Sequence, residues 1–416
     1  AATFTTLNGS IGQAAATRIG AGRLTVSAAN GGITLNEANL VDTLGGLTAW
    51  TDIGFRNTGD LQLDGDIAVA GHDVMLRSNT GAISQISGTI TAMGLGLEAN
   101  GAIMLGGANN VTNLHSAIAG GDILYRNAGA LMLWGDITAA GHEVTLSTDS
   151  GSLLQMLFTG GIITANRLNA SAGGALNLNH ANRVNELGNY VAGSGLAGFT
   201  NDGSFALTGD VSGDELALTA LSGGISQVSG IITTGSVLAT ASESIELGGA
   251  NLISGAGPVR LNSSNGNVTF RALDDFTLDF GSAAGTFDVT SNNGSIGQSG
   301  AITANRLNAR AGGNIALTSN NAVATLGFLT GGDIAFNAAG DLLLTDAIDA
   351  SGAVTLVANV GEITQSGGAI TAASLNVSAG QDVLLGQANT VAAFAGSSAT
   401  GNITLRNTGS ISLDPI

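Results

Sequence analysis

The chain has 416 residues, of which 44% are hydrophobic, 4% are aromatic and only 10% are charged, with a formal net charge of −18. It contains 65 Gly and no Cys, and its 12 basic residues are all Arg, which excludes disulfides and thiol chemistry and disfavours binding to nucleic acid or anionic membranes. No run of 18 apolar residues occurs, so the sequence predicts no transmembrane helix.

A motif of Gly, any residue, Ile or Leu, any residue, Gln first occurs at residues 9–13 and then recurs along the chain. Successive copies are 67 to 72 residues apart, and Ile-Thr-Ala or Ile-Thr-Thr follows most of them. A fixed period of this kind indicates a repeat architecture. The Gln residues of the motif are Gln13, Gln85, Gln155, Gln227, Gln298 and Gln365.

Two further landmarks keep the same period. An Asn that precedes Val or Ile by two positions occurs at Asn39, Asn109, Asn182, Asn251, Asn321 and Asn389. The motif Arg-Asn-(Thr/Ala)-Gly occurs at 56–59, 126–129 and 406–409. Three landmarks with one period make the repeat of about 70 residues a strong signal.

Short segments that alternate apolar and variable residues lie between these landmarks, for example at 315–317, 334–336 and 342–344. This alternation is typical of strands with one buried face, and the Gly, Asp and Asn clusters between them are typical of turns. Antiparallel hairpins are the alternative, but no Asn-Gly hairpin turn recurs at a fixed place. Recurring side-chain types favour in-register parallel stacking, including Asn ladders. The sequence therefore predicts an all-β, right-handed parallel β-helix with about three strands per coil, about 23 residues per coil and roughly 18 coils.

One continuous β-helix rod over residues 1–416 is expected, with repeats at 9–80, 81–150, 151–222, 223–293, 294–360 and 361–416, the last of them incomplete. Both ends fall inside a repeat. An uncapped solenoid exposes strand edges that favour pairing. We therefore expect end-to-end self-association, or continuation of a longer rod.

The segments GDITAAGHEVTLSTDSGSLLQ (residues 135–155) and GSIGQSGAITANRLNARAGGNIALTSNNAVATLG (residues 294–327) resemble the rod repeats of filamentous haemagglutinin-like proteins. The resemblance extends over essentially the whole chain. These are large bacterial exoproteins of two-partner secretion, so it implies a right-handed β-helix, a location at the bacterial cell surface and a filament or adhesin role. The family's N-terminal secretion domain, with its Asn-Pro-Asn motifs, is not represented, and no functional residues are carried over.

Several residues are candidates for chemistry. His72 and His142 occur in matching Ala-Gly-His-(Asp/Glu)-Val segments, but a separation of three coils, ~14 Å, prevents them from sharing a metal. Surface turn positions are expected for both, and for His115 and His180. Five Gly-Asp pairs lack the spacing of calcium-binding β-rolls, and we expect these carboxylates to be solvated. Their aspartates are Asp66, Asp122, Asp136, Asp210 and Asp333.

Asp274, Asp275 and Asp279 form the one cluster that invites comparison with polysaccharide hydrolases or lyases, because paired carboxylates can act as acid and base. In register, however, Asp274 and Asp275 replace Gly59 and Asp60 of the first repeat, which favours a turn.

The remaining motifs are weaker. The G-x-G-x-x-G match at 193–198 lacks the strand-to-helix context of a dinucleotide site. The Asn-x-Ser/Thr sequences at Asn262, Asn376 and Asn402 are acceptors only in a glycosylating host. Among the rare aromatics Trp50, Trp134, Tyr125 and Tyr190, Tyr125 is expected to point inward and Trp134 outward as a candidate contact for a partner.

The sequence therefore predicts an extracellular structural or adhesive β-helix, with no catalytic, cofactor-binding or metal-binding residues and no cofactor. A carbohydrate-active β-helix enzyme is the alternative. The receptor, which could be a cell-surface carbohydrate, is not identified by any residue pattern.

Overall fold

The computed structural model describes residues 1–156 and 161–414, and two predicted repeats extend outside these ranges, at 157–160 and 415–416. Apart from the 3₁₀ turn η1 (Ser254–Ala256), the regular elements of the described residues are β-strands. The chain divides into two compact units, residues 1–214 (unit 1) and 215–416 (unit 2), and each is described by itself. The single continuous domain therefore stays a prediction.

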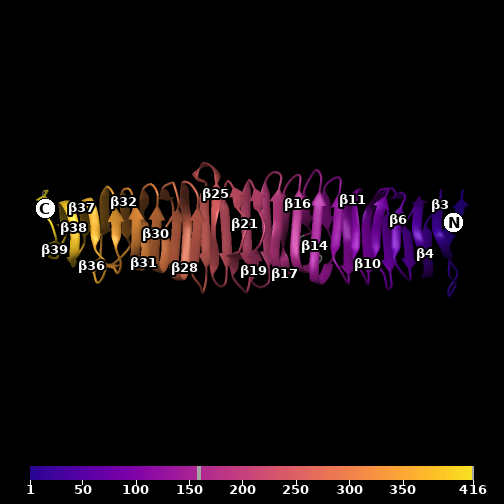
Figure 1. The fold of residues 1–416 in the computed structure, drawn as a ribbon, viewed down its shortest axis with the longest axis horizontal. Coiled ribbons are helices and arrows are strands. Elements are labelled where there is room, and N and C mark those ends of the chain that lie inside the picture. The colour runs from indigo at the N-terminus through magenta and orange to yellow at the C-terminus, as the bar shows by residue number, and fades with distance from the viewer. Residues whose placement is uncertain (157–160, 415–416) are drawn as a thin grey trace. The chain divides into compact units, whose positions relative to one another are not determined.

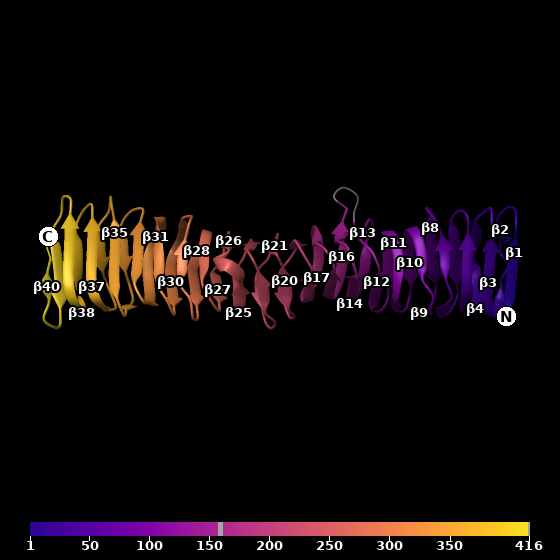
Figure 2. The ribbon, with the colours of Figure 1, turned by 90° about the horizontal axis from the view of Figure 1, so that it is seen from above.

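Unit 1 contains strands β1 to β20, which Figures 1 and 2 show stacked side by side. They are β1 (Ala2–Thr6), β2 (Ile11–Gly12), β3 (Gly20–Ala28), β4 (Ile33–Ala49), β5 (Ile53–Asn57), β6 (Leu61–Asp64), β7 (Ile67–Val69), β8 (Asp73–Ser78), β9 (Ile83–Ser87), β10 (Ile90–Ala99), β11 (Ile103–Ala119), β12 (Ile123–Asn127), β13 (Leu131–Leu133), β14 (Ile137–Thr148), β15 (Leu153–Gln155), β16 (Ile163–Ala172), β17 (Leu176–Ala192), β18 (Leu196–Asn201), β19 (Phe205–Leu207) and β20 (Val211–Gly213).

Unit 2 contains η1 and strands β21 to β40. They are β21 (Glu215–Ala220), β22 (Ile225–Gln227), β23 (Ile232–Thr234), β24 (Val237–Ala241), β25 (Ile245–Ile253), β26 (Pro258–Ser263), β27 (Val268–Ala272), β28 (Phe276–Ser291), β29 (Ile296–Gln298), β30 (Ile302–Ala311), β31 (Ile315–Gly331), β32 (Ile334–Ala338), β33 (Leu342–Leu344), β34 (Ile348–Ala350), β35 (Ala353–Ala358), β36 (Ile363–Gln365), β37 (Ile370–Ala379), β38 (Val383–Ser398), β39 (Ile403–Asn407) and β40 (Ser412–Leu413).

Within each unit the strands pair in parallel with the strands of the next turn. In unit 1, Ile83 is in register with Ile103, Ile103 with Ile123, and Ile123 with Val144. In unit 2 the same kind of column joins Ile225, Ile245, Val268 and Phe287. The prediction of an all-β parallel β-helix is confirmed in both units.

The core of each unit is made by inward side chains, which alternate with outward ones along most strands. In β35, for example, Val354, Leu356 and Ala358 are buried, while Thr355 and Val357 are half-buried on the outward side. Stacking in register places Ile on Ile, so the core is a narrow set of aliphatic columns rather than one globular cluster. Glycine permits close packing of turns, because a Cβ at Gly135 would collide with the carbonyl oxygen of His115 in the turn below.

Each turn consists of three strand segments, as predicted. The turn that begins at Val144 continues through β15 and the first half of β16, and it closes at Leu168, the register partner of Val144. The described residues of the two units hold about 20 turns, slightly more than the roughly 18 coils expected. The column from Ile83 to Val144 advances by only 20 or 21 residues per turn, fewer than expected, whereas the turn from Val144 to Leu168 takes 24.

The repeat of about 70 residues was expected to cover three turns. It covers three turns and one further strand segment, which lies on the adjacent side of the β-helix. The column that starts at Ile83 reaches Val144 after three turns, and the next motif residue, Leu153, follows on the adjacent face. Unit 2 shows the same relation, because the column from Ile225 ends at Phe287 and Ile296 follows. Equivalent residues of successive repeats within a unit therefore face different sides of the β-helix.

Candidate functional site

The Gln and Asn landmarks are hydrogen-bonded to each other across one turn. Gln85 Nε2 donates to Asn109 Oδ1 at 2.9 Å, and Asn109 Nδ2 donates back to Gln85 Oε1 at 3.2 Å. Asn109 Oδ1 also accepts the backbone N–H of Ile90, the first residue of the Ile-Thr-Ala motif, at 2.9 Å. Since Asn109 is fully buried, these bonds satisfy an amide that would otherwise be costly to bury.

The same reciprocal Gln–Asn pair occurs six times among the described residues, and each Asn is fully buried. The pairs are Gln13–Asn39, Gln85–Asn109, Gln155–Asn182, Gln227–Asn251, Gln298–Asn321 and Gln365–Asn389. Two landmarks that are separate in the sequence are thus the two halves of one contact.

The Asn of the third landmark, Arg-Asn-(Thr/Ala)-Gly, lies one turn beyond the Asn of the Gln–Asn pair. Asn127 is in register with Asn109, and its amide bonds both Val111 N and Val111 O, at 3.0 and 2.9 Å. Its Nδ2 also donates to the carbonyl oxygens of Gly129 and Ala130, which lie just after it in the same turn. Gln85, Asn109 and Asn127 therefore form an amide column through three successive turns.

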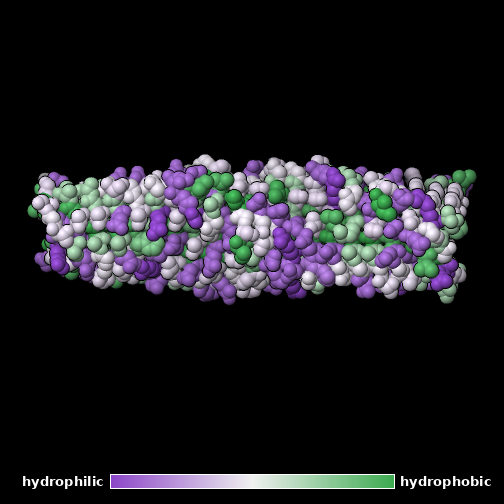
Figure 3. Space-filling model, viewed as in Figure 1, coloured by the Kyte–Doolittle hydropathy of each residue, from purple (hydrophilic) through white to green (hydrophobic). Residues whose placement is uncertain are grey.

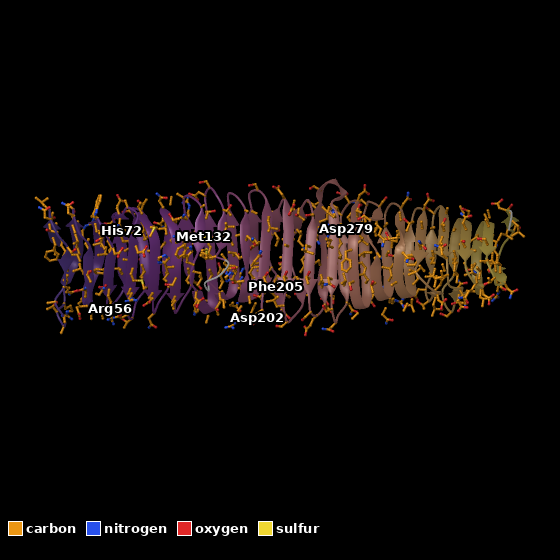
Figure 4. The ribbon with its side chains drawn as sticks, turned by 180° about the vertical axis from the view of Figure 1, so that it is seen from behind. Arg56, His72, Met132, Asp202, Phe205 and Asp279 are labelled. Carbon is orange, nitrogen blue, oxygen red and sulfur yellow. The ribbon has the colours of Figure 1, made fainter. Side chains whose placement is uncertain are left out.

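Arginine side chains connect turns on the outward side. Arg126 Nε donates to Asp149 at 2.7 Å, and this carboxylate raises the pKa of Arg126. Arg56 Nε makes the matching bond to Asn79 Oδ1 at 2.8 Å (Figure 4). In two copies of the third landmark the Arg is therefore bound to a residue one turn further along the chain.

Two arginines reach across two turns. Arg306 crosses Gly327 and pairs with Asp346, and it also donates to Thr345 Oγ1 at 3.2 Å. A Cβ at Gly327 would lie 2.8 Å from Arg306 Nε, so the side chain needs glycine beneath it. In unit 1, Arg23 crosses Gly45 to Asp64 in the same way. Hydrogen bonds from Arg23 and from Ser87 lower the pKa of Asp64.

Many acidic residues serve as acceptors between turns, and they include at least four of the five Gly-Asp aspartates, all of which are exposed. Asp66, Asp122, Asp136 and Asp333 each accept a backbone N–H from the following turn. The donors are Thr89, Glu143, Ile162 and Ala353, at 2.8 to 3.1 Å. For Asp210, the backbone N–H donates to Asn189 Oδ1. Much of the acidic composition is therefore explained by bonds within the fold.

The structure places Asp274 and Asp275 in a turn and Asp279 in the strand that follows it. Asp274 and Asp275 are exposed in the turn before β28, where Asp275 Oδ1 accepts the backbone N–H of Ser295. Asp279 (Figure 4) follows the inward residue Leu278 and pairs with Arg260. Four residue steps of extended chain place the backbone of Asp279 ~13 Å from that of Asp275. Hydrogen bonds from Ser299 and Arg260 lower the pKa of Asp279, which is unfavourable for a general acid.

His72 lies in a turn, as expected, whereas His115, His142 and His180 lie within strands β11, β14 and β17. His72 Nδ1 (Figure 4) is 3.5 Å from Asp52, and His142 Nδ1 is 3.6 Å from Asp122, so each faces a carboxylate one turn away. His115 lies 3.8 Å from Asp73, and His180 is half-buried. In the described part of the chain, no three His, Asp or Glu residues are grouped so that they could hold a metal ion.

Tyr125 points inward and Trp134 outward, as predicted. Tyr125 is fully buried and donates to Asn127 Oδ1, and Tyr190 is fully buried as well. Trp134 is 39% exposed and stacks on His115, with ring centroids 5.4 Å apart, while Trp50 is 67% exposed. After residues 193–195 the chain enters β18, so a strand rather than a helix follows the G-x-G-x-x-G segment. None of the described helices is long and apolar enough to cross a membrane.

On the face seen in Figure 3, hydrophilic and hydrophobic residues are interspersed on the surface of each unit. The landmarks are engaged in bonds between turns, so the residues available to a ligand are the variable outward ones. Sequence reasoning missed the Gln–Asn pair, although its spacing is a usable signal: the two residues are 23 to 27 positions apart, about one predicted coil.

Two consecutive segments of unit 2, residues 265–330 and 331–395, match a family of repeats of unknown function (DUF5649). Each segment includes one Gln–Asn pair, Gln298–Asn321 in the first and Gln365–Asn389 in the second. No curated protein and no solved structure matches the chain.

Proposed function

We propose that this chain is a structural and adhesive β-helix of a bacterial surface filament or adhesin, exported by two-partner secretion and acting outside the cell. The carrying observation is that all three repeat landmarks are used in bonds between turns. A fold held by recurring internal bonds leaves its outward positions free to vary, which suits a scaffold that displays contacts to a partner. The location and the secretion route rest on the resemblance to filamentous haemagglutinin-like proteins.

The proposed partners are further copies of the chain, or a longer chain that includes it, and a cell-surface receptor. In a solenoid each turn contacts only its neighbours, so the same hydrogen-bond ladder can be extended by further turns. This property supports a role in fibres without requiring a dedicated interface domain.

The test combines electron microscopy of the untagged chain with attachment of chain-coated beads to cell surfaces, using beads coated with an unrelated acidic protein as the control. We expect protease-resistant fibres, or attachment of the chain-coated beads to cells at a higher level than that of the control beads. A protease-sensitive monomer that gives neither result would overturn the proposal. Hydrolysis or cleavage of a polysaccharide that is lost in Asp274→Ala would replace it by a carbohydrate-active enzyme.

A further inference from the structure

Two outward grooves with matching positions occur, one in each unit. The first groove is a hollow of about 440 Å³ lined by Thr145, Leu146, Asn169, Ala170, Ser171, Asn189, Val191 and Asp210. The second groove, of about 220 Å³, is lined by Thr355, Val357, Asn376, Val377, Ser378, Ala395, Gly396 and Ser397. Thr145 and Thr355 both lie ten residues before the motif Gln, and Thr145 is in register with Asn169 as Thr355 is with Asn376.

The polar atoms of these grooves are mainly uncharged hydroxyl and amide groups. In the first groove, Asn169 Nδ2 donates to Glu143 Oε1 at 2.8 Å, and Asn169 Oδ1 accepts the backbone N–H of Asn189 at 3.0 Å. In the second groove, Ser397 Oγ lies 3.2 Å from Ser378 Oγ, while Asn376 is exposed. Such groups both donate and accept hydrogen bonds, as sugar hydroxyls require.

A third copy of this position is filled by the protein itself. In the fifth repeat Arg310 stands where Ser171 and Ser378 stand, and its guanidinium lies 5.2 Å from the centroid of the Phe328 ring. Arg306 lies beside it over Gly327. The first and second grooves are thus open because small or neutral residues occupy these positions.

We propose that the two grooves bind an extended, uncharged polysaccharide segment, which deepens the proposed adhesive function by naming its ligand class. Equivalent outward groups recur at the spacing of turns, ~4.8 Å, close to the length of one sugar residue in an extended glycan. The Thr and Asn that lie on successive turns in each groove can therefore bond successive sugars. The net charge of −18 favours a neutral ligand over an anionic one.

The experiment is calorimetric titration of the full chain with cellohexaose, an extended neutral glycan, and with maltohexaose, a curved one. Thr145→Val/Thr355→Val removes one hydroxyl from each groove and keeps the β-branched shape. Thr303→Val/Thr371→Val, at exposed strand positions outside both grooves, is the matched control. We expect wild type and the control to bind cellohexaose at two sites, and the groove variant to bind it about three- to tenfold more weakly.

No binding of cellohexaose by folded wild type, or equal binding by the groove variant, overturns the inference. Equal affinity for cellohexaose and maltohexaose would contradict the argument that the spacing of the turns selects an extended glycan. A chain that resists protease and holds beads on cells but binds neither glycan leaves the adhesive proposal standing. A chain that neither holds beads on cells nor binds a glycan would overturn both the adhesive proposal and the glycan inference.

Discussion

The two units differ at the third position of their amide columns. In unit 1 this position is always an amide, at Asn57, Asn127 and Asn201, whereas unit 2 has Ala272 and Ala338. Both alanines are buried and keep the same register beneath Asn251 and Asn321. The last copy, in unit 2, returns to Asn407.

This difference separates what the fold requires from what it tolerates. The Gln–Asn pair is present in all six described copies, while the amide below it can be replaced by a methyl group without a change of register. The middle Asn serves three partners, namely the Gln, the Ile backbone and the carbonyl of the next turn, as Asn109 does with Gln85, Ile90 and Arg126. The third amide bonds mainly the backbone of its own corner. We therefore place most of the column's stabilisation at the middle Asn.

The largest effect is expected from Asn109→Ala in unit 1 and Asn321→Ala in unit 2. Each change leaves a half-buried Gln amide and a buried backbone N–H without their acceptor, at about 1–3 kcal/mol for each group. Local stability should fall by about 3 kcal/mol in both units, measured as hydrogen exchange of the flanking strands, because stability in a solenoid is a sum of local terms. The outward Asn262→Ala is the control, and an equal effect there would refute the central role of the middle Asn.

Alkaline pH should distinguish the units next, because both tyrosines of the chain lie in unit 1. Burial raises the pKa of Tyr125 and Tyr190 above the ordinary value of 10.0. Their contribution is fully present below pH 10, and it is lost as pH rises because the unfolded state gains by ionising. Tyrosinate absorbance should therefore appear together with unfolding of unit 1, while unit 2 stays protected from protease.

Tyr125→Phe/Tyr190→Phe should abolish this difference between the units, apart from the hydrogen bonds lost from Tyr125 to Asn127 and from Tyr190 to Gly198. Tyrosine ionisation at an ordinary pKa in the folded chain, or simultaneous alkaline unfolding of unit 2, would contradict this explanation.

A smaller effect should follow from exchanging the third residue between the units. Asn127→Ala removes the bonds to Val111 N and Val111 O and should cost about 1–2 kcal/mol. Ala338→Asn installs the same amide at a position with the same register, and it should raise local stability by about 1 kcal/mol. Denaturant midpoints and hydrogen exchange measure both. Destabilisation by Ala338→Asn would mean that the corner of unit 2 is packed too tightly for an amide.

The repeat landmarks and the alternating apolar segments between them were sufficient to predict the fold, because short one-sided strands with recurring side-chain types favour in-register parallel stacking. The partner of Asn109 was not predicted, although its distance of 24 residues from Gln85 is close to one coil. The advance of half a turn per repeat could not be found from spacing alone, since three turns of 23 residues and three and a half turns of about 20 residues give nearly the same period. The grooves depend on small residues two turns away, and no local motif marks them.

Arg306, which crosses two turns, offers the test with the smallest expected effect on stability and the closest dependence on local geometry. Gly327→Ala places a Cβ against Arg306 and Asn308 Oδ1, so Arg306 must leave its path to Asp346. Since this ion pair is partly exposed, its loss should cost only about 0.5–1 kcal/mol, and added salt should shrink the difference from wild type. Gly386→Ala is the control, because Gly386 also lies in a strand and a Cβ added there would meet no atom within 4 Å. Equal effects of the two substitutions would mean that the cost comes from the strand backbone and that the Arg306 contact contributes nothing of its own.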